Sequence, residues 1–457
     1  MIFSDSNNAN FILTTKRVII SVFLLCSTVF APAQKPWTLQ ACIDRAKTAN
    51  LTIRQKQIAV EQAAVAVKNA QCQRLPSISA TIGQSYDLGI SPSALGTYAQ
   101  YNASVNTFSA SLSMSLFSGF RIHNGIKAAK LEWQAEIADS NQTRLNVIIN
   151  VIAGYLQVLL NKELVSAAQE ESVLSCKQIE RTRQLVEAGK LSQSELYEGH
   201  AQIAKDSSAI IKTESDLRLS LVDLAQQLQL KDISEFDIDS SNISTIPLYT
   251  ILPSSNIDSL YQLTLQHYPA VQSAQYRIEK GKSEIAIARS GYFPTLSLNG
   301  GYYNGYYFYY NLANGVKNES FSNQLYQNQQ QIISINLQVP IFDHFDVSHK
   351  VKATKLDLQQ QVLTLEDEKQ QLYKTIQQVY YRSIAAKAKY ISLQKETAAL
   401  QIAYHYALEK FEVGKATTFE VNEKQTALSE VTSEQLEAKY DYLFSCLTMN
   451  FYIGNGI

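Results

Sequence analysis

The sequence predicts a mixed α+β membrane protein in which very long coiled-coil helices are joined to β-strands, and the whole pattern occurs twice in the chain. Three observations predict this fold class: a repeat along most of the 457 residues, a pair of alternating apolar and polar segments in each half, and two long proline-free helical patterns. Self-similarity over most of a chain is the strongest guide to its architecture. We therefore expect an internal duplication, with four strands per chain.

The chain opens with a pattern typical of a secretory signal peptide. Lys16 and Arg17 precede an apolar run over residues 18–30, and small residues follow up to Ala33, so we expect cleavage after residues 1–33. A lipid anchor on Cys26 is the alternative, but Leu25 lies where a lipoprotein signal has a small residue. No later stretch is expected to cross a bilayer as a helix, so the exported chain is either soluble or a β-barrel protein.

Three pairs of segments recur in one order with nearly one spacing. They are RLPSISATIG and YFPTLSLNGG, SLSMSLFSGF and SINLQVPIFDHF, and EAGKLSQSEL and EVGKATTFEV. We expect a first repeat over residues 34–233, a polar linker over 234–256 and a second repeat over 257–457.

Each repeat begins with a helix and continues with two strands, over about 77–117 and about 295–342. Apolar residues such as Ile78, Ala80 and Ile82 alternate with serine and threonine, and the run from Phe108 to Leu116 alternates in the same way. Strands of about ten residues have the length of a tilted transmembrane β-strand.

Four strands cannot close a barrel, and open edges in lipid would leave backbone groups unpaired. Three copies would close a 12-stranded barrel, with the polar face toward the lumen and the aliphatic face toward lipid. Tyr302, Tyr306 and Phe308 continue the lipid-facing parity and are expected in an aromatic girdle. Sugar binding by this tyrosine-rich strand and an aggregation-prone segment are the alternatives.

Long helices are predicted at about 122–186 and 347–411, and each leads to a hairpin turn, near Gly189 and near Gly414. A glycine at a helix C-terminus readily adopts the left-handed conformation that such a turn needs. Return helices are expected to about residues 230 and 449. Rods of this length are stable when they pack side by side as coiled coils.

This layout resembles the TolC-type outer-membrane efflux proteins over essentially the whole mature chain. The strand starts at Pro76 and Pro294, the LFSG and IFDH turns, and the AGKL and VGKA hairpins carry the resemblance. It implies a homotrimer in the cell outer membrane, with the barrel continued by a long periplasmic α-barrel. The implied function is a passive exit duct that works with a periplasmic adaptor and an inner-membrane pump.

The glutamates after the hairpins are the candidate entrance residues. Glu195 and Glu198 lie six and nine residues past Gly189, and Glu420 and Glu423 lie at the same offsets past Gly414. The resemblance implies an acidic periplasmic entrance, and rings of carboxylates favour cations. Glutamates stabilised by the helix dipole are the alternative interpretation. Some relatives carry Arg two residues past the second glycine, where this chain has Ala416.

The hairpin turns are also where the resemblance implies adaptor docking. Gly189 and Lys190 form one turn, Gly414 and Lys415 the other, and the alternative is that the lysines are ordinary solvated turn residues.

Other classes of function are less well supported. Enzymatic metal chemistry would rest on Asp343, His344, Asp346 and His349 in DHFDVSH, where Asp343 is a natural N-cap, so no enzyme, metal or cofactor is expected. With 40 basic and 41 acidic residues, nucleic acid is not expected as a partner. A secreted or periplasmic structural coiled-coil protein without channel activity remains as the alternative. The mature cysteines, Cys42, Cys72, Cys176 and Cys446, are expected to be small buried hydrophobes rather than disulfides.

Overall fold

The structure, a computed structural model, describes residues 36–92, 98–233, 236–240, 256–312 and 315–453. The expected signal peptide, Cys26 and most of the expected linker lie outside these residues.

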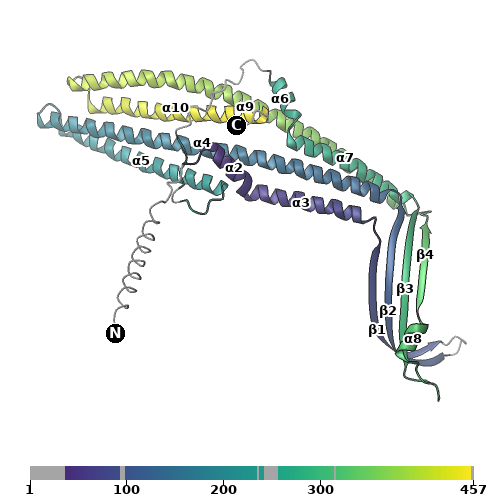
Figure 1. Cartoon of the computed structure of the whole chain (residues 1–457). Coiled ribbons are helices and arrows are strands. Elements are labelled where there is room, and N and C mark those ends of the chain that lie inside the picture. Colours follow the sequence, from purple (N-terminus) through teal and green to yellow (C-terminus); the bar gives the residue numbers. More distant parts are fainter. Residues whose placement is uncertain (1–35, 93–97, 234–235, 241–255, 313–314, 454–457) are drawn as a thin grey trace, which may run out of the picture. The chain divides into compact units, whose positions relative to one another are not determined.

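Helices dominate the described chain, and strands come in pairs between them (Figure 1). The helices of the first half are α2 (Leu39–Ala49), α3 (Leu51–Cys72), α4 (Arg121–Glu187) and α5 (Gln193–Gln227). Those of the second half are α6 (Ile257–Leu265), α7 (Pro269–Arg289), the 3-10 turn η2 (Ser290–Tyr292), α8 (Phe321–Gln327), α9 (Asp346–Glu412) and α10 (Thr418–Ile453). The strands are β1 (Ser77–Pro92), β2 (Tyr98–Ser118), β3 (Thr295–Tyr309) and β4 (Gln330–Gln338). The predicted fold class is confirmed, and α4 and α9 each have 67 residues.

The chain divides into two compact units, and each unit takes segments from both sequence halves. The hairpin unit comprises Met1–Asp44, Val151–Pro247 and Ala407–Ser429. The sheet unit comprises Arg45–Asn150, Leu248–Tyr406 and Glu430–Ile457.

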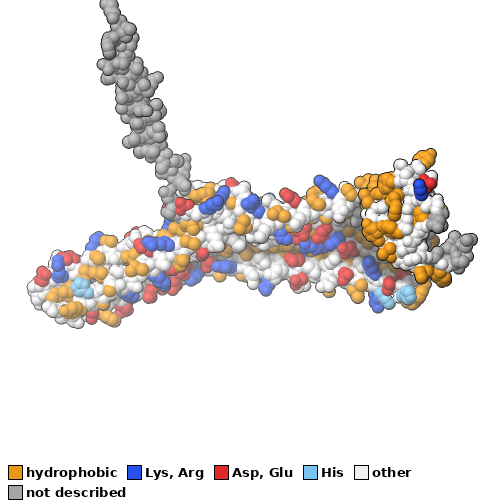
Figure 2. All heavy atoms as spheres, turned by 90° about the horizontal axis from the view of Figure 1, so that it is seen from below, with side chains coloured by type: hydrophobic (Ala, Val, Ile, Leu, Met, Phe, Trp, Pro, Cys, Tyr) orange, Lys and Arg blue, Asp and Glu red, His pale blue; other side chains and the backbone are white. Residues whose placement is uncertain are grey.

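The strands form one antiparallel sheet in the order β1-β2-β3-β4. The register places Ile82, Phe108 and Asn304 side by side, so one face collects the aliphatic residues of all four strands. We call this the apolar face; its members include Ile78, Ala80, Ile82, Leu112, Met114, Leu296, Leu298, Ile333, Ile335 and Leu337. Ile78 is 74% exposed, Ile82 78% and Ile333 83%. Figure 2 shows hydrophobic side chains gathered over the strands.

The opposite face of the sheet is polar at the end where β1 begins. Ser79, Ser111 and Ser113 lie on it, with Ser79 and Ser111 hydrogen-bonded at 2.7 Å and Ser113 donating to Asn299 at 3.0 Å. We call it the polar face.

Two strand details differ from the sequence expectation. A bulge between Ser115 and Phe117 places Phe117, rather than Leu116, opposite Leu296. β4 ends at Gln338 rather than near residue 342, because Pro340 has no N–H to donate to the ladder.

The expectation that no segment after the leader could cross a membrane as a helix was too strict. An 18-residue window of α4 has a mean hydropathy of 1.4, so by length and composition alone this helix could cross a membrane. Half of that window is buried within the protein.

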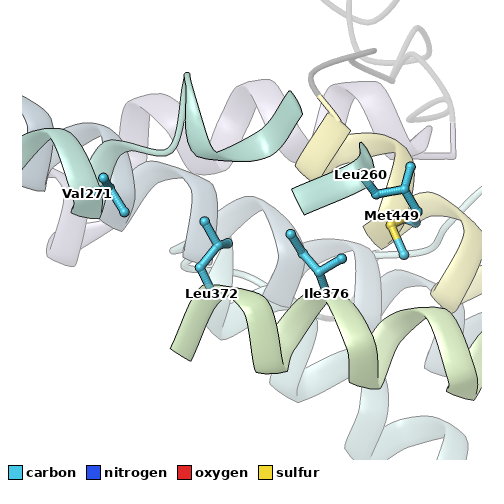
Figure 3. Packing of buried hydrophobic residues seen from close by; sticks show 5 residues of the cluster. All are labelled: Leu260, Val271, Leu372, Ile376 and Met449. Carbon is cyan, nitrogen blue, oxygen red and sulfur yellow. The ribbon is translucent and has the colours of Figure 1, made fainter. Parts of the chain in front are cut away.

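One core of the sheet unit joins four helices of the second half (Figure 3). Leu260 of α6, Val271 of α7, Leu372 and Ile376 of α9, and Met449 of α10 are all at most 6% exposed. Pro269 begins α7, where a missing N–H costs nothing. This packing fixes α7, and hence the start of β3, against the end of α10.

Candidate functional site

The two predicted hairpin turns share one backbone geometry. The N–H of Gly189 donates to the carbonyl of Val186 and that of Lys190 to Leu185, both at 2.9 Å. The second turn repeats this pattern, with Gly414 bonded to Phe411 and Lys415 to Lys410. These are Schellman motifs, which need a left-handed residue, and φ is 69° at Gly189 and 73° at Gly414. Lys190 and Lys415 are exposed at the turns.

The first candidate glutamate links the two hairpins of the hairpin unit. A carboxylate oxygen of Glu195, in the first turn of α5, accepts the N–H of Thr418, the first residue of α10, at 2.9 Å. Thr417 caps the same helix, since its hydroxyl oxygen accepts the N–H of Glu420 at 3.2 Å. Glu195 is therefore an N-terminal cap for a helix of the other repeat.

The remaining candidate glutamates lie close to this contact along the chain. Glu198 and Glu423 are exposed, and Glu420 is half-buried. Glu423 pairs with its neighbour Lys424 at 2.9 Å, which compensates part of its charge. The structure thus places the carboxylates of both repeats in one unit, at the starts of the two return helices.

Polar contacts continue along the hairpins away from the turns. Gln425 donates to Ser175 at 2.7 Å where both are buried, and Ser429 donates to the carboxylate of Glu171. These bonds tie α10 to α4. Separating Gln425 from Ser175 would leave each buried group without its partner, so this bond favours one register of the two hairpins.

The predicted girdle residues lie on the apolar face, toward the end of β3. Tyr302 and Phe308 are each 38% exposed, whereas Tyr306 is half-buried. The ring of Phe321 in α8 packs edge-on against Tyr306 at 5.1 Å between centroids. The sequence prediction missed α8, although Ser320 is an N-cap signal and its hydroxyl accepts the N–H of Asn323.

The other tyrosines of β3 lie over glycines on the polar face. A Cβ added to Gly301 would be 2.4 Å from the ring of Tyr303, and one added to Gly305 would be 3.0 Å from that of Tyr307. The glycines therefore leave room for tyrosine rings to lie along the strand. Tyrosine rings resting on glycines also protect the bare backbone.

The sequence DHFDVSH forms a strand-to-helix turn. One carboxylate oxygen of Asp343 accepts the N–H of Phe345 at 3.0 Å and the other that of Val347 at 2.9 Å. His344 and Phe345 have φ values of 56° and 66°, and Gly119 and Phe120 have 59° and 65° in the matching turn of the first repeat. Both Asp343 oxygens serve the backbone at the start of α9.

The cysteines differ in burial, contrary to the expectation that all four are buried. Cys42 and Cys446 are buried, but Cys72 and Cys176 are exposed, and all four are free. Cys72 is the last residue of α3 and Cys176 lies on a solvated face of α4.

A contact missed from the sequence ties the chain before α2 to the chain after α5. Trp37 forms a parallel bridge with Ile238, and the hydroxyl of Tyr155 donates to the carbonyl of Asp239 at 2.8 Å. Lys162 donates to the carbonyl of Ile238 at 2.9 Å and pairs with Asp237 at 2.5 Å. Burial raises the pKa of Tyr155, so the phenol stays protonated and remains a donor.

The sheet exposes one apolar face, and the two helices of 67 residues end in paired hairpins. These features define the class: a membrane protein that combines a β-sheet with long helical hairpins. The sequence profile described as "Outer membrane efflux protein" matches residues 42–228 and 260–455. The chain therefore belongs to the outer membrane efflux protein family and is an outer-membrane protein.

Individual relatives are distant but cover most of the chain. Outer membrane protein TolC of Vibrio cholerae is 23% identical over 85% of this chain and 84% of its own length. Proteases secretion protein PrtF of Dickeya chrysanthemi is 21% identical over 68% of this chain, and the match spans 64% of PrtF. The crystal structure of CusC superimposes with a TM-score of 0.78 at 17% identity, over 92% of both chains, which supports the shared fold.

Proposed function

We propose that this protein is a passive outer-membrane exit duct for substrates delivered by an inner-membrane pump through a periplasmic adaptor. Three chains close one 12-stranded barrel, and their helices form a tunnel into the periplasm. The chain carries out no chemistry, and the partner pump supplies the energy. The family match and the names of two relatives, a secretion protein and an outer membrane protein, support this assignment.

One structural observation carries the proposal. The sheet exposes an apolar face while β1 and β4 are its edge strands. In lipid, the unpaired backbone of both edges would cost several kcal/mol per group. Pairing β1 of one chain with β4 of the next removes both edges and leaves the apolar faces outward.

The hairpin unit supplies the proposed entrance and docking residues. Glu198, Glu420 and Glu423, with Glu195 positioned at the cap of α10, form the acidic ring when three chains converge. Gly189, Lys190, Gly414 and Lys415 form the turns that the adaptor contacts. Tyr302, Tyr306 and Phe308 form the girdle at the membrane surface.

Two measurements test this function. The mass of the native assembly extracted in detergent from outer membranes should equal three chains, and a monomer or a soluble protein would contradict the duct. In planar bilayers, the combined substitution Glu420→Ala and Glu423→Ala should lower cation preference and weaken block by divalent ions.

A matched control separates a ring from a general charge effect. Glu434 is exposed on the same helix, α10, eleven residues past Glu423, and Glu434→Ala should leave conductance and ion preference unchanged. If both variants behave alike, the acidic ring is wrong while the duct itself stands.

A further inference from the structure

Helix α8 lies at the end of the sheet remote from α3 and α7 (Figure 1). It occupies the connection between β3 and β4, and it packs mainly on β3. If the helices extend into the periplasm, this end of the sheet is at the outer surface of the membrane.

Side-chain amides attach this connection to the edge of β3. β4 pairs with β3 only from Thr295 to Tyr303, so the rest of β3 lacks a strand partner on that side. Gln324 replaces the partner at Tyr307, accepting its N–H and donating to its carbonyl, both at 2.9 Å. Asn318 does the same at Tyr309, at 2.8 and 2.9 Å. Two amides thus reproduce the paired hydrogen bonds of an antiparallel neighbour.

Further bonds fix the position of α8. Asn328 donates to the carbonyl of Gly305 at 2.7 Å, and Asn304 donates to the carbonyl of Leu325 at 2.8 Å. Gln324 is buried, and its polar side chain tolerates burial because its amide oxygen and its amide nitrogen both have hydrogen-bond partners. Helix α8 is therefore a fixed part of the sheet.

The aromatic contacts of α8 are on the apolar face. Phe321 packs edge-on against Tyr306 at 5.1 Å and against Phe108 at 6.4 Å. Asn304, which binds the helix, shares this face with Phe108. The helix therefore covers the same side of the sheet that carries the exposed aliphatic residues.

The position of α8 along the sheet coincides with the end of the aliphatic run on β2, β3 and β4. Going toward the far end of the sheet, the apolar face changes to Asn106 on β2, Asn304 on β3 and Gln331 on β4, whereas β1 carries Leu88 and Ile90 beyond its own Gln84. A barrel's lipid-facing band ends where polar side chains begin, and aromatic residues gather at that boundary. Helix α8 lies at this transition.

The composition of α8 also fits a membrane surface. Residues 321–342, which include α8 and β4, contain no charged side chain, and Lys317 and Glu319 precede the helix. Phe321 is 49% exposed and Tyr326 is 78% exposed, between uncharged serine, asparagine and glutamine. Tyrosine favours such interfaces because its ring is apolar and its hydroxyl is polar.

We propose that α8 is an interfacial helix that lies in the headgroup layer of the outer leaflet, where Phe321 and Tyr326 contact lipid and extend the girdle of Tyr302 and Phe308. This assignment rests on the proposed function, because it requires the apolar face of the sheet to face lipid. The partner is the lipid surface itself.

Tryptophan quenching in vesicles tests the proposal. Tyr326→Trp and, separately, Ile335→Trp are made in full-length protein that carries Trp37→Phe and Trp133→Phe, and each is reconstituted into phosphatidylcholine vesicles. Ile335 is a matched reference, because it is 65% exposed within the aliphatic band of the apolar face. Lipids brominated at shallow or deep acyl positions and aqueous acrylamide are the quenchers.

We expect the tryptophan of Tyr326→Trp to be quenched about twofold more by shallow than by deep bromines, because interfacial aromatic rings lie at the headgroup level. The tryptophan of Ile335→Trp should show the reverse order. If Ile335→Trp responds to bromolipid but Tyr326→Trp responds only to acrylamide, α8 points into water and the α8 proposal is wrong, while the lipid-facing sheet stands. If bromolipid does not quench Ile335→Trp, the lipid-facing assignment fails, and the α8 proposal fails with it.

Discussion

The carboxylate of Glu195 accepts a hydrogen bond from the backbone N–H of Thr418 at 2.9 Å, so a residue of the first repeat caps a helix of the second. The first N–H groups of a helix have no partner within the helix, and a side-chain oxygen that satisfies one stabilises the helix start. Because both residues follow their hairpin glycines within six positions, this bond couples the starts of the two return helices.

Loss of this cap should loosen the start of α10. Glu195→Ala removes the acceptor, and we expect the local opening free energy at Thr418 to fall by about 1 kcal/mol. Glu195→Gln keeps an oxygen acceptor and should retain most of that stability. Hydrogen exchange of the segment from Thr417 to Val421, followed by mass spectrometry, measures the difference. Equal exchange in the two variants would mean that the bond does not stabilise the helix start.

Substitution of the hairpin glycines should destabilise the protein because of their backbone conformation and not because of steric contacts. An added Cβ at Gly189 or Gly414 meets nothing within 4 Å, but φ is 69° and 73°. Gly189→Ala and Gly414→Ala should each destabilise by about 1–2 kcal/mol, because L-residues disfavour this region.

A third glycine is the control for the hairpin substitutions. Gly125 lies within α4, where an added Cβ would meet nothing within 4 Å and φ is not positive. Gly125→Ala should therefore stabilise slightly, by about 0.5–1 kcal/mol, as alanine does within a helix. Melting of the purified protein compares all three variants. A similar loss in all of them would exclude the backbone explanation.

The fold was predictable because its signals are periodic and occur twice. Alternation over Ser77 to Leu88 and the absence of proline in α4 and α9 are strong local patterns, and Gly189 and Gly414 mark the ends of those helices. The bulge that exchanges Leu116 for Phe117 was not predictable, since the sequence keeps alternating through Leu116 and the extra residue shows only in the pairing with β3.

The contacts within the candidate site were harder to predict from the sequence than the location of the site. The offsets from the glycines located Glu195, but its bond to Thr418 joins residues 223 positions apart. The same limit applies to Trp37 and Ile238, whose bridge depends on tertiary packing. Helix α8 has seven residues, too few for a helical period to be visible in the sequence.

The protein should lose stability above pH 9. Burial raises the pKa of the Cys42 thiol from its ordinary 9.0 to about 12, and that of the Tyr452 phenol from 10.0 to about 12. These groups stay protonated in the folded protein while the unfolded chain ionises, so their contribution is complete below pH 9 and is lost as pH rises toward about 12. Melting temperature measured from pH 8 to pH 12 should fall across this window.

Two cysteine variants separate this effect from general alkaline damage. Cys42→Ala removes one of the buried groups and should reduce the fall between pH 9 and about 12. Cys72→Ala removes an exposed thiol and should leave the profile unchanged. If both variants keep the full fall, burial of Cys42 is not its source.

Two neighbouring glycines of β3 should differ in how well they tolerate substitution by alanine. A Cβ at Gly301 would lie 2.4 Å from the ring of Tyr303, whereas one at Gly300, on the other face, would lie 3.7 Å from Leu112. Gly301→Ala must therefore lift the tyrosine ring off the strand, at a cost of about 1–3 kcal/mol, whereas Gly300→Ala should fit. If the polar face lines the duct, the lifted ring narrows it, and single-channel conductance should fall for Gly301→Ala alone. Unchanged conductance in a destabilised Gly301→Ala protein would place Tyr303 outside the lumen, because a ring displaced within the duct must obstruct part of the ion path.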